Sequence, residues 1–321
     1  MEHYDLENLE VCSWGLFEIV GIPRRARDFK NKMLILTSAA EVTAVSKEAR
    51  RAGRRVGFVP TMGALHEGHL SLVRTARAQS DVVIASVFVN PAQFGPNEDF
   101  SRYPRNAERD SAMLAAEKTD YLFMPSVEEM YPPGATAWVK VEGISDKLDG
   151  RSRPGHFHGV TTVVAKLFNI VQPDFAFFGQ KDAAQVAIVS KMVRDLNFDV
   201  RIVVCPIVRE ADGLAMSSRN AYLSPEQRKQ AIVLYRALMR VQSLVDRGES
   251  NSARLLVAGT QVMAEEPAVK LDYFEIVNNA TLDPVSDVSR GALIAVAAYV
   301  GNTRLIDNVL VTGPGSSAPP R

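Results

Sequence analysis

The sequence predicts an α/β protein with a doubly wound, mostly parallel sheet and a smaller C-terminal α+β domain. Short apolar runs alternate with amphipathic stretches through residues 33–208, which is the pattern of repeated strand–helix–strand units. Residues 81–89 form a nearly unbroken apolar run, as expected for a central strand that helices cover on both faces. Two of these runs lead directly into a glycine turn and a helix, and this arrangement places candidate ligand-binding loops at the carboxyl ends of strands.

Each predicted element of the larger domain has a local cause. Thr37 or Ser38 supplies a polar cap for the first helix, and Pro60, which has no N–H, is predicted to end the second strand. Apolar periodicity gives the remaining bounds. The predicted strands are 34–36, 56–59, 81–89, 120–124, 174–178 and 200–204. The predicted helices are 38–51, 66–79, 106–118, 159–171 and 183–196, and residues 131–158 are expected to be irregular.

The alternation of strands and helices breaks at residues 206–220, where we place a domain boundary. Beyond it, helices are predicted at 225–247 and 251–264, and strands at 271–277, 292–300 and 304–309. The expected division is an N-terminal extension at 1–32, a larger domain at 33–208, a smaller lid domain at 209–312 and a disordered Gly/Ser/Pro tail at 313–321. We expect the extension to be a flexible appendage, or the result of a start codon assigned upstream of Met33.

Composition excludes several classes of function. The chain has 321 residues with 37 Lys+Arg and 37 Asp+Glu, and a net charge of zero is unlike that of a general nucleic-acid binder. Cys12 and Cys205 are too few and too distant for a disulfide framework or a zinc cluster, which fits a reducing cytoplasm. No apolar run is long enough to span a bilayer, and the start of the chain does not have the pattern of a secretory signal.

The most informative segment is residues 55–72, which contains the sequence His66-Glu-Gly-His69 at a predicted helix start. A strand, a tight glycine turn and a helix N-terminus together present unpaired amides and a positive dipole end, which suit a phosphate. The spacing of three places both imidazoles on one face of the first helical turn. Gly68 is expected to leave the backbone bare for a ligand.

Other motif assignments fail on spacing or composition. A zinc protease motif needs histidines four residues apart, and neither a Walker A lysine nor a G-x-G-x-x-G fingerprint is present. The alternative is that the two histidines only cap the helix. The H-x-G-H pattern resembles the phosphate-handling signature of the class I nucleotidyltransferase and aminoacyl-tRNA synthetase superfamily.

Three further segments carry polar side chains to predicted strand ends or to the domain boundary. Gln93 lies in the loop after the strand at 81–89, where ligand contact is favoured over a plain loop amide. Lys181 lies at a helix start, where its charge opposes the helix dipole unless an anion is bound. Residues 217–219 form either a site segment or an ordinary turn. His156 and His158 have no clear third metal ligand, and we expect them to be structural or peripheral.

Four motifs together resemble the pantoate–β-alanine ligase family over residues 33–311. They are residues 58–70, 87–94, 178–182 and 208–220, in family order. The resemblance implies a Rossmann-like fold of the nucleotidyltransferase type and the ATP-dependent condensation of pantoate with β-alanine through a pantoyl-adenylate. It also implies release of AMP and pyrophosphate, a requirement for Mg²⁺, a cytoplasmic location and a homodimer.

The resemblance also assigns roles to residues. Catalytic roles fall on His69, the implied proton donor, and on His66, Lys181 and Arg219, which would contact phosphate oxygens. ATP binding falls on Met62, Gly63, Ala64, Leu65, His66, Glu67, Gly68, His69, Gly179, Gln180, Lys181, Asp182, Val208, Met216, Ser217, Ser218 and Arg219. Pantoate and β-alanine binding falls on Gln93 and Gln185, while Asn90 and Phe94 are weaker candidates. Neutral amides orient a carboxylate with little charge compensation, which leaves it nucleophilic. The Mg²⁺ ligands are not assigned.

Two other functions remain open from the residues. The first is a nucleotidyltransferase that acts on a different small acid or phosphoester. The second is a non-catalytic nucleotide sensor that kept the fold, which the presence of His66, His69, Lys181 and Arg219 disfavours.

Overall fold

The computed structural model describes residues 32–96 and 98–312, and the described residues from Met33 onward group into one compact unit. The expectations for residues 1–31 and for the tail at 313–321 lie outside the described residues. Within the compact unit there are two sheets, one of six strands and one of three. The predicted domain boundary at residues 208 and 209 remains a prediction.

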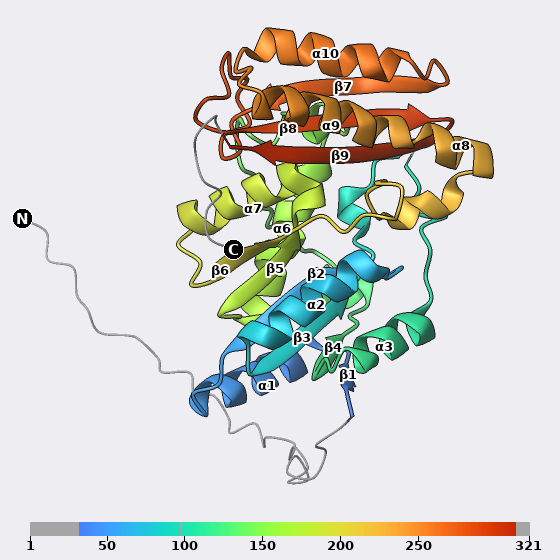
Figure 1. Cartoon of the computed structure of the whole chain (residues 1–321). Coiled ribbons are helices and arrows are strands. Elements are labelled where there is room, and N and C mark those ends of the chain that lie inside the picture. The colour runs from blue at the N-terminus through green and yellow to red at the C-terminus, as the bar shows by residue number, and fades with distance from the viewer. Residues whose placement is uncertain (1–31, 97, 313–321) are drawn as a thin grey trace, which may run out of the picture. The chain divides into compact units, whose positions relative to one another are not determined.

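The six-stranded sheet is parallel, as the sequence predicts (Figure 1). Its spatial order is β1-β4-β3-β2-β5-β6, so the chain moves outward on one side of β2 and then crosses to β5 on the other side. The switch point therefore lies between β2 and β5. The strands are β1 (Leu34–Leu36), β2 (Val56–Thr61), β3 (Val82–Val87), β4 (Tyr121–Phe123), β5 (Phe175–Gly179) and β6 (Arg201–Cys205).

Helices cover both faces of this sheet, and alternate strand residues enter different cores. The helices are α1 (Ala39–Arg51), α2 (Glu67–Gln79), α3 (Ala107–Ala116), α6 (His156–Val171) and α7 (Ala183–Asp195), with two short helices, α4 (Val127–Met130) and α5 (Asp149–Ser152). On β3, Val82 and Ile84 belong to the core beneath α1, α6 and α7, whereas Val83 and Ala85 belong to the core beneath α2 and α3.

Three predictions about the elements were wrong, whereas the other predicted bounds agree with the structure to within two residues. Pro60 does not end β2, because the pairing of β2 with β5 covers only Gly57 and Phe58, and a proline without N–H is tolerated where that ladder has already stopped. The helix predicted from residue 159 begins at His156, because Gly155 adopts a left-handed conformation, with φ of 83°, that ends the preceding loop. The predicted helix at 225–247 is two helices, α8 (Pro225–Gln230) and α9 (Ile232–Asp246).

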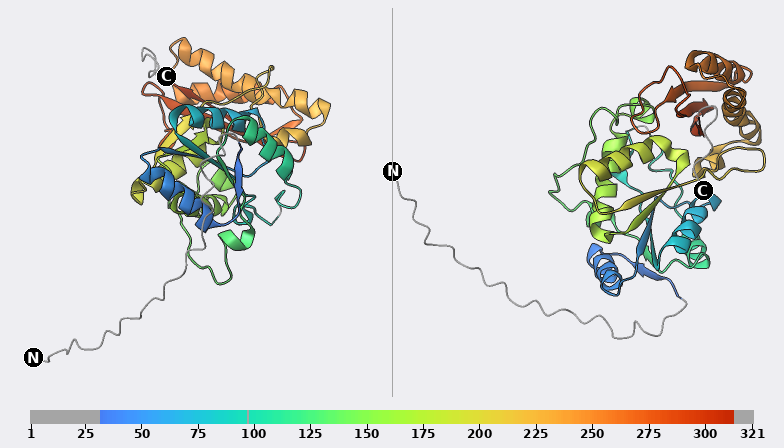
Figure 2. Two further views of the ribbon diagram at one scale, coloured as in Figure 1. Left: turned by 90° about the horizontal axis from the view of Figure 1, so that it is seen from below. Right: turned by 60° about the vertical axis from the view of Figure 1, so that its left-hand side comes forward.

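The smaller sheet is an antiparallel meander of β7 (Val269–Val277), β8 (Ala292–Val300) and β9 (Thr303–Val311). The helices α9 and α10 (Ser252–Ala264) cover one of its faces, and Figure 2 shows this layer stacked beside the parallel sheet. Along β8, Ile294 and Val296 pack under α9 and α10, whereas Leu293 and Ala295 join the core that contains α6. Both faces of the small sheet are therefore buried. None of the helices in the described part of the chain has the length and apolarity needed to cross a bilayer.

Candidate active site

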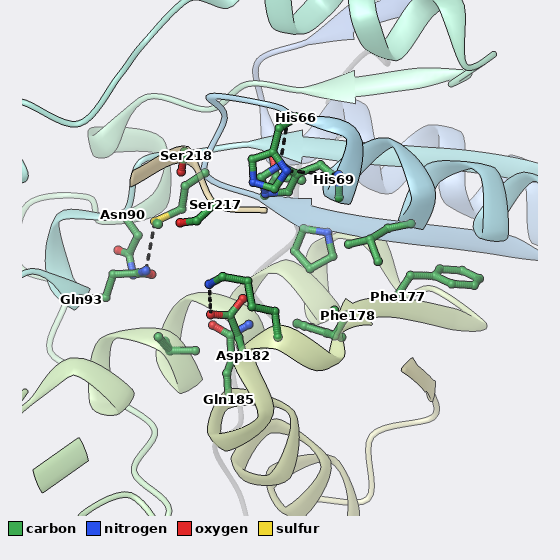
Figure 3. Close-up of a pocket in the computed structure, with 18 of the residues that line it drawn as sticks. His66, His69, Asn90, Gln93, Phe177, Phe178, Asp182, Gln185, Ser217 and Ser218 are labelled. Atoms are coloured by element: carbon green, nitrogen blue, oxygen red, sulfur yellow. Dashed lines mark hydrogen bonds and ion pairs between the residues drawn. The ribbon is translucent and has the colours of Figure 1, made fainter. Parts of the chain in front are cut away.

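A cavity of about 220 Å³ lies at the carboxyl ends of β2 and β5, at the switch point of the sheet. The two strand-end turns, α6, α7 and the segment after β6 form its wall. Figure 3 shows the rings of His66 and His69 on one side of the cavity and the side chains of Asp182 and Gln185 on the other. Ligands of open α/β sheets bind at this position.

The two imidazoles form a reciprocal capping box at the N-terminus of α2, in which each ring accepts a hydrogen bond from a backbone N–H of the first turn. His66 is the N-cap residue, and its Nδ1 accepts a hydrogen bond from the Gly68 N–H at 3.1 Å, while the His69 Nδ1 accepts from the His66 N–H at 3.3 Å. Because both Nδ1 atoms accept, the proton of each neutral ring resides on Nε2. The capping geometry therefore fixes the tautomer and leaves each Nε2–H as a hydrogen-bond donor.

Burial keeps both rings neutral. Burial, followed by the charge of Lys181, lowers the pKa of His66 to about 4. Burial, followed by the neighbouring His66, lowers the pKa of His69 to about 3. The ring centroids are 4.1 Å apart, so a charge on one ring disfavours a charge on the other. At neutral pH the pair supplies N–H dipoles rather than positive charges.

The neutral imidazoles make stability depend on pH. In the unfolded chain they titrate near their ordinary 6.5, so below that pH the unfolded state binds protons that the folded state does not. Above pH 6.5 both rings are neutral in the folded and the unfolded state, so their full contribution to the free energy of unfolding is present. It is lost as the pH falls toward the folded pKa values of about 4 for His66 and about 3 for His69. We expect the free energy of unfolding, measured by urea titration, to be lower at pH 5 than at pH 7. The decrease should be smaller in a His69→Asn variant, and an equal decrease in both proteins would contradict the assignment.

Gly68 serves the histidine pair rather than an approaching ligand. A Cβ atom at this position would lie 2.9 Å from Cε1 and Nδ1 of His66. The expectation that Gly68 leaves the backbone bare is therefore corrected, because the His66 ring occupies that space. The glycine is required for the cap itself.

The turn before the histidines is held by Asp110 of α3, which the sequence analysis missed. This carboxylate is 1% exposed and accepts hydrogen bonds from the N–H groups of Ala64 at 2.8 Å and Leu65 at 2.9 Å. Gly63 and Ala64 both have positive φ, so the turn is a conformation that needs external support. Nothing in the local sequence links Asp110 to a turn 45 residues earlier.

Removing this carboxylate should destabilise the protein. An Asp110→Ala variant leaves two buried N–H groups without an acceptor, and we expect a loss of about 1–3 kcal/mol for each group. Urea denaturation of this variant and of Glu108→Ala, an exposed residue of the same helix, provides the comparison. Equal stabilities of the two variants would show that Asp110 does not support the turn.

A second network fixes the loop after β3. The Asn90 amide donates to the Oε1 of Gln93 at 3.0 Å, the Tyr131 hydroxyl donates to the Oδ1 of Asn90 at 2.9 Å, and the Gln93 amide donates to the Sδ of Met62 at 3.0 Å. Gln93 itself is 8% exposed and lines the cavity. Its side chain thus faces the histidine turn in a defined orientation.

His156 supports the same loop from α6. Arg153 donates to its Nε2 at 3.0 Å, so its proton lies on Nδ1, which donates to the Gln93 carbonyl at 2.8 Å. Burial, followed by the Arg153 charge, lowers the pKa of His156 to about 4. His158 instead packs on Trp138, with ring centroids 5.1 Å apart. The two histidines therefore do not form a metal pair, and His156 is a structural residue in the cavity wall rather than a peripheral one.

Charged groups line the side of the cavity nearest the small sheet. The Nζ of Lys181 lies 3.6 Å from Asp182. Burial alone would raise the pKa of Asp182, but the positive charges of Lys181 and Arg219 outweigh it and lower that pKa. Arg219 donates from Nε and Nη2 to both oxygens of Asp99, at 3.0 and 2.9 Å. The guanidinium has five N–H donors, so this pairing leaves its Nη1 edge for a ligand. A second cavity of about 670 Å³ shares Lys181, Asp182 and Arg219 with the first, together with Ser217 and Arg153.

The structure brings most of the predicted site residues to one cavity. The predicted residues that line the first cavity are Met62, His66, Gly68, His69, Asn90, Gln93, Gly179, Lys181, Asp182, Gln185, Val208, Met216, Ser217, Ser218 and Arg219. Gly63, Ala64, Leu65, Glu67, Gln180 and Phe94 are not among the lining residues. The first three shape the turn, and the Glu67 carboxylate pairs with Arg74 on the surface. Gln180 hydrogen-bonds to the small sheet.

Sequence reasoning also missed Asp99, Tyr103 and Arg153. Arg153 forms a two-point ion pair with Glu98, and the Tyr103 hydroxyl lies 3.4 Å from the Oγ of Ser218. These side chains meet across more than 50 residues of sequence.

The parallel sheet with a polar cavity at its switch point defines a nucleotide-binding enzyme of the α/β class. Comparison with known proteins gives the particular family. The family model for pantoate-beta-alanine ligase matches residues 34–310. A pantothenate synthetase of Koribacter versatilis is 60% identical over 289 residues, which cover 90% of this chain and 99% of that protein. One of Acidobacterium capsulatum is 66% identical over 258 residues, or 80% of this chain and 86% of the relative.

Solved structures agree. The crystal structure of pantothenate synthetase from Thermus thermophilus matches with a TM-score of 0.82 and 51% identity, over 86% of this chain and 99% of that one. A Francisella tularensis pantoate-beta-alanine ligase, complexed with beta-gamma ATP and beta-alanine, matches with a TM-score of 0.72 and 36% identity, over 87% and 98% of the two chains. The chain belongs to the pantoate–β-alanine ligase family.

Proposed function

We propose that this protein condenses pantoate with β-alanine in an ATP-dependent reaction, through a pantoyl-adenylate. The pantoate carboxylate attacks the α-phosphorus of ATP and pyrophosphate leaves. The β-alanine amine then attacks the acyl carbonyl, giving pantothenate and AMP. The observation that carries the proposal is the convergence of paired imidazole donors, a lysine and two glutamines on one cavity of a member of this family.

We propose that ATP lies between the histidine turn and the residues shared by the two cavities. Attack at phosphorus places charge on the phosphoryl oxygens and on the leaving pyrophosphate, so fixed donors are more useful than mobile ones. The Nε2–H groups of His66 and His69 are fixed by the caps, and the Nη1 edge of Arg219 is oriented by Asp99. Lys181 adds a full positive charge at the same wall.

Because both rings are neutral, we propose that His69 acts by hydrogen bonding in the adenylation step. A neutral imidazole donates its Nε2–H to a phosphate oxygen without first taking up a proton. The pKa of about 3 places the cationic form far from the neutral pH range. The family resemblance implies that His69 donates a proton. In the free protein its ring is neutral, which supports a role as a hydrogen-bond donor.

We propose that Gln93 and Gln185 orient the two carboxylate substrates beside the phosphates. The apolar face of α6, with Val160, Val163 and Leu167, forms the neighbouring wall and suits the methyl groups of pantoate. Neutral amides hold the acid without quenching its charge, so the ground state is not overstabilised relative to the transition state.

Mg²⁺ fits this site only together with the triphosphate. Among the described residues there is no group of three or more His, Cys, Asp or Glu side chains that could hold a metal, and Asp182 is the single carboxylate in the described lining of the first cavity. Mg²⁺ is commonly bound through one or two carboxylates and substrate phosphates. We therefore propose Asp182 as its protein contact. When bound, the ion would neutralise charge on the phosphates. A homodimer and a cytoplasmic location, both implied by the resemblance, stay predictions.

A panel of acids tests the proposal against its alternatives. Isotope exchange between pyrophosphate and ATP should depend on pantoate, and AMP release should require β-alanine as well. Exchange supported by a different acid would favour another nucleotidyltransferase. ATP binding without exchange for any acid would favour a nucleotide sensor.

The Gln93 amide should affect pantoate more than ATP. A Gln93→Ala variant loses the amide while keeping the backbone carbonyl that His156 holds, so we expect the KM for pantoate to rise by about tenfold or more. The KM for ATP should change much less. Steady-state kinetics with each substrate varied in turn measures both values, and equal rises would refute a pantoate contact.

A further inference from the structure

The small sheet hydrogen-bonds to the Lys181 turn through a buried side chain, Asn308 of β9. Asn308 is 3% exposed, and its Nδ2 donates to the carbonyl oxygens of Gln180 at 3.0 Å and Lys181 at 2.9 Å. Its Oδ1 accepts from the Nε2 of Gln180 at 3.0 Å. Both N–H groups and one acceptor position of the amide are thus used on a single turn.

Asn308 is itself rigidly held. The neighbouring Asp307 is buried, accepts two hydrogen bonds from Arg209 at 2.6 and 3.0 Å, and accepts a third from the Asn308 N–H at 2.7 Å. Arg209 also donates to the Asn308 carbonyl at 3.3 Å. Residue 308 pairs with Ala295 of β8, the central strand of the small sheet. The contact with the Lys181 turn is therefore made by a fixed group and not by a flexible side chain.

Lys181 has no comparable anchor of its own. Its side chain is 20% exposed, and the one ion pair that it forms among the described residues is the 3.6 Å contact with Asp182, which exceeds hydrogen-bond distance. A lysine stem has four rotatable carbons, so the position of its ammonium depends on where the backbone holds its base. That backbone is the turn Gln180–Asp182, whose carbonyls Asn308 holds.

We propose that Asn308 is a positioning residue for Lys181, through which the C-terminal sheet sets the place of the ammonium in the nucleotide site. The inference rests on the proposed function only for the role of Lys181 at the phosphates. It assigns to the small sheet a part in the first chemical step, in addition to covering the cavity. The hydrogen bonds predict that loss of Asn308 affects turnover only while Lys181 is present.

A double-mutant cycle tests this dependence. The full-length protein carries Asn308→Ala, Lys181→Met, or both, and each variant is assayed for pantoate-dependent pyrophosphate exchange. Displacement of a catalytic group by about 1 Å costs up to about 100-fold in rate, so we expect Asn308→Ala to lower kcat about 10- to 100-fold with the KM for pantoate unchanged. In the Lys181→Met background, Asn308→Ala should have no further effect.

Three comparisons keep the result unambiguous. Lys147→Ala removes another contact to the C-terminal part of the chain, at Asp283 and the Thr281 carbonyl in the loop between β7 and β8. It does not touch the Lys181 turn, and it should leave kcat unchanged. Thermal unfolding identifies any loss of fold, and Asn308→Ser replaces Asn308→Ala if the latter does not fold. A wild-type protein without exchange activity would overturn the proposed function and this inference together.

Three outcomes with an active wild type overturn the inference alone. One is a normal kcat in the folded Asn308 variant. The second is an equal drop in Lys147→Ala, which would indicate general domain docking. The third is a drop of the same size in the presence and absence of the Lys181 ammonium.

Discussion

Replacing His69 by alanine is expected to slow formation of the acyl-adenylate about 10²–10³-fold, which is the usual scale for losing one preorganised donor. The reason is that the Nε2–H of His69 is aimed by its cap and needs no reorientation during the reaction. Rapid-quench measurement of a single turnover, with enzyme in excess over ATP, reports this step directly.

Two further variants separate the donor from the cap. In His69→Asn the side-chain oxygen can still accept from the His66 N–H, so we expect wild-type stability with a rate as low as that of the alanine variant. In His69→Gln the amide N–H reaches the former position of Nε2, and we expect partial recovery. Arg74→Ala, on the surface of the same helix, is the matched control. A near-normal single-turnover rate in His69→Asn would refute the donor role.

Replacing Lys181 by methionine is expected to reduce the same rate about 10²–10³-fold while leaving the fold intact. Methionine preserves the length of the stem but removes the charge, so the loss reports on electrostatic stabilisation at the wall shared by the two cavities. The KM for pantoate should change little, because the acid is proposed to lie beside the glutamines.

The control for this charge lies on the helix that follows the turn. Lys191 pairs with Asp195 at 2.7 Å on the exposed face of α7, and Lys191→Met should change neither rate nor stability appreciably. Steady-state and single-turnover kinetics of the two methionine variants are compared side by side. Similar rates for Lys181→Met and Lys191→Met would remove Lys181 from the mechanism.

The sequence was sufficient for those parts of the fold that depend on short-range patterns. Val82 and Ile84 alternate with Val83 and Ala85 between two cores, and such a run of apolar residues predicts a central strand covered on both faces. Pro60 was assigned wrongly because its tolerance depends on how far β5 extends beside β2, which no local pattern reveals.

The site shows the same difference between short-range patterns, which could be predicted, and long-range contacts, which could not. His66 and His69 were found because three-residue spacing at a helix start fixes their relation locally, and Gln93 was found because it follows a predicted strand. Asp110 and Asn308 were missed because each acts on a turn far away in sequence, through backbone groups that any residue possesses. Local spacing therefore identified side chains that face the ligand cavity, but not those that hold them in place.

The central claim is that this site activates an acid at the α-phosphate of ATP before the amine takes part. The most direct measurement is a single turnover with ATP and pantoate but no β-alanine, analysed after acid quench. We predict about one equivalent of pyrophosphate and an enzyme-bound pantoyl-adenylate, which β-alanine then converts to pantothenate and AMP. Formation of ADP, or no pyrophosphate until β-alanine is added, would contradict the account.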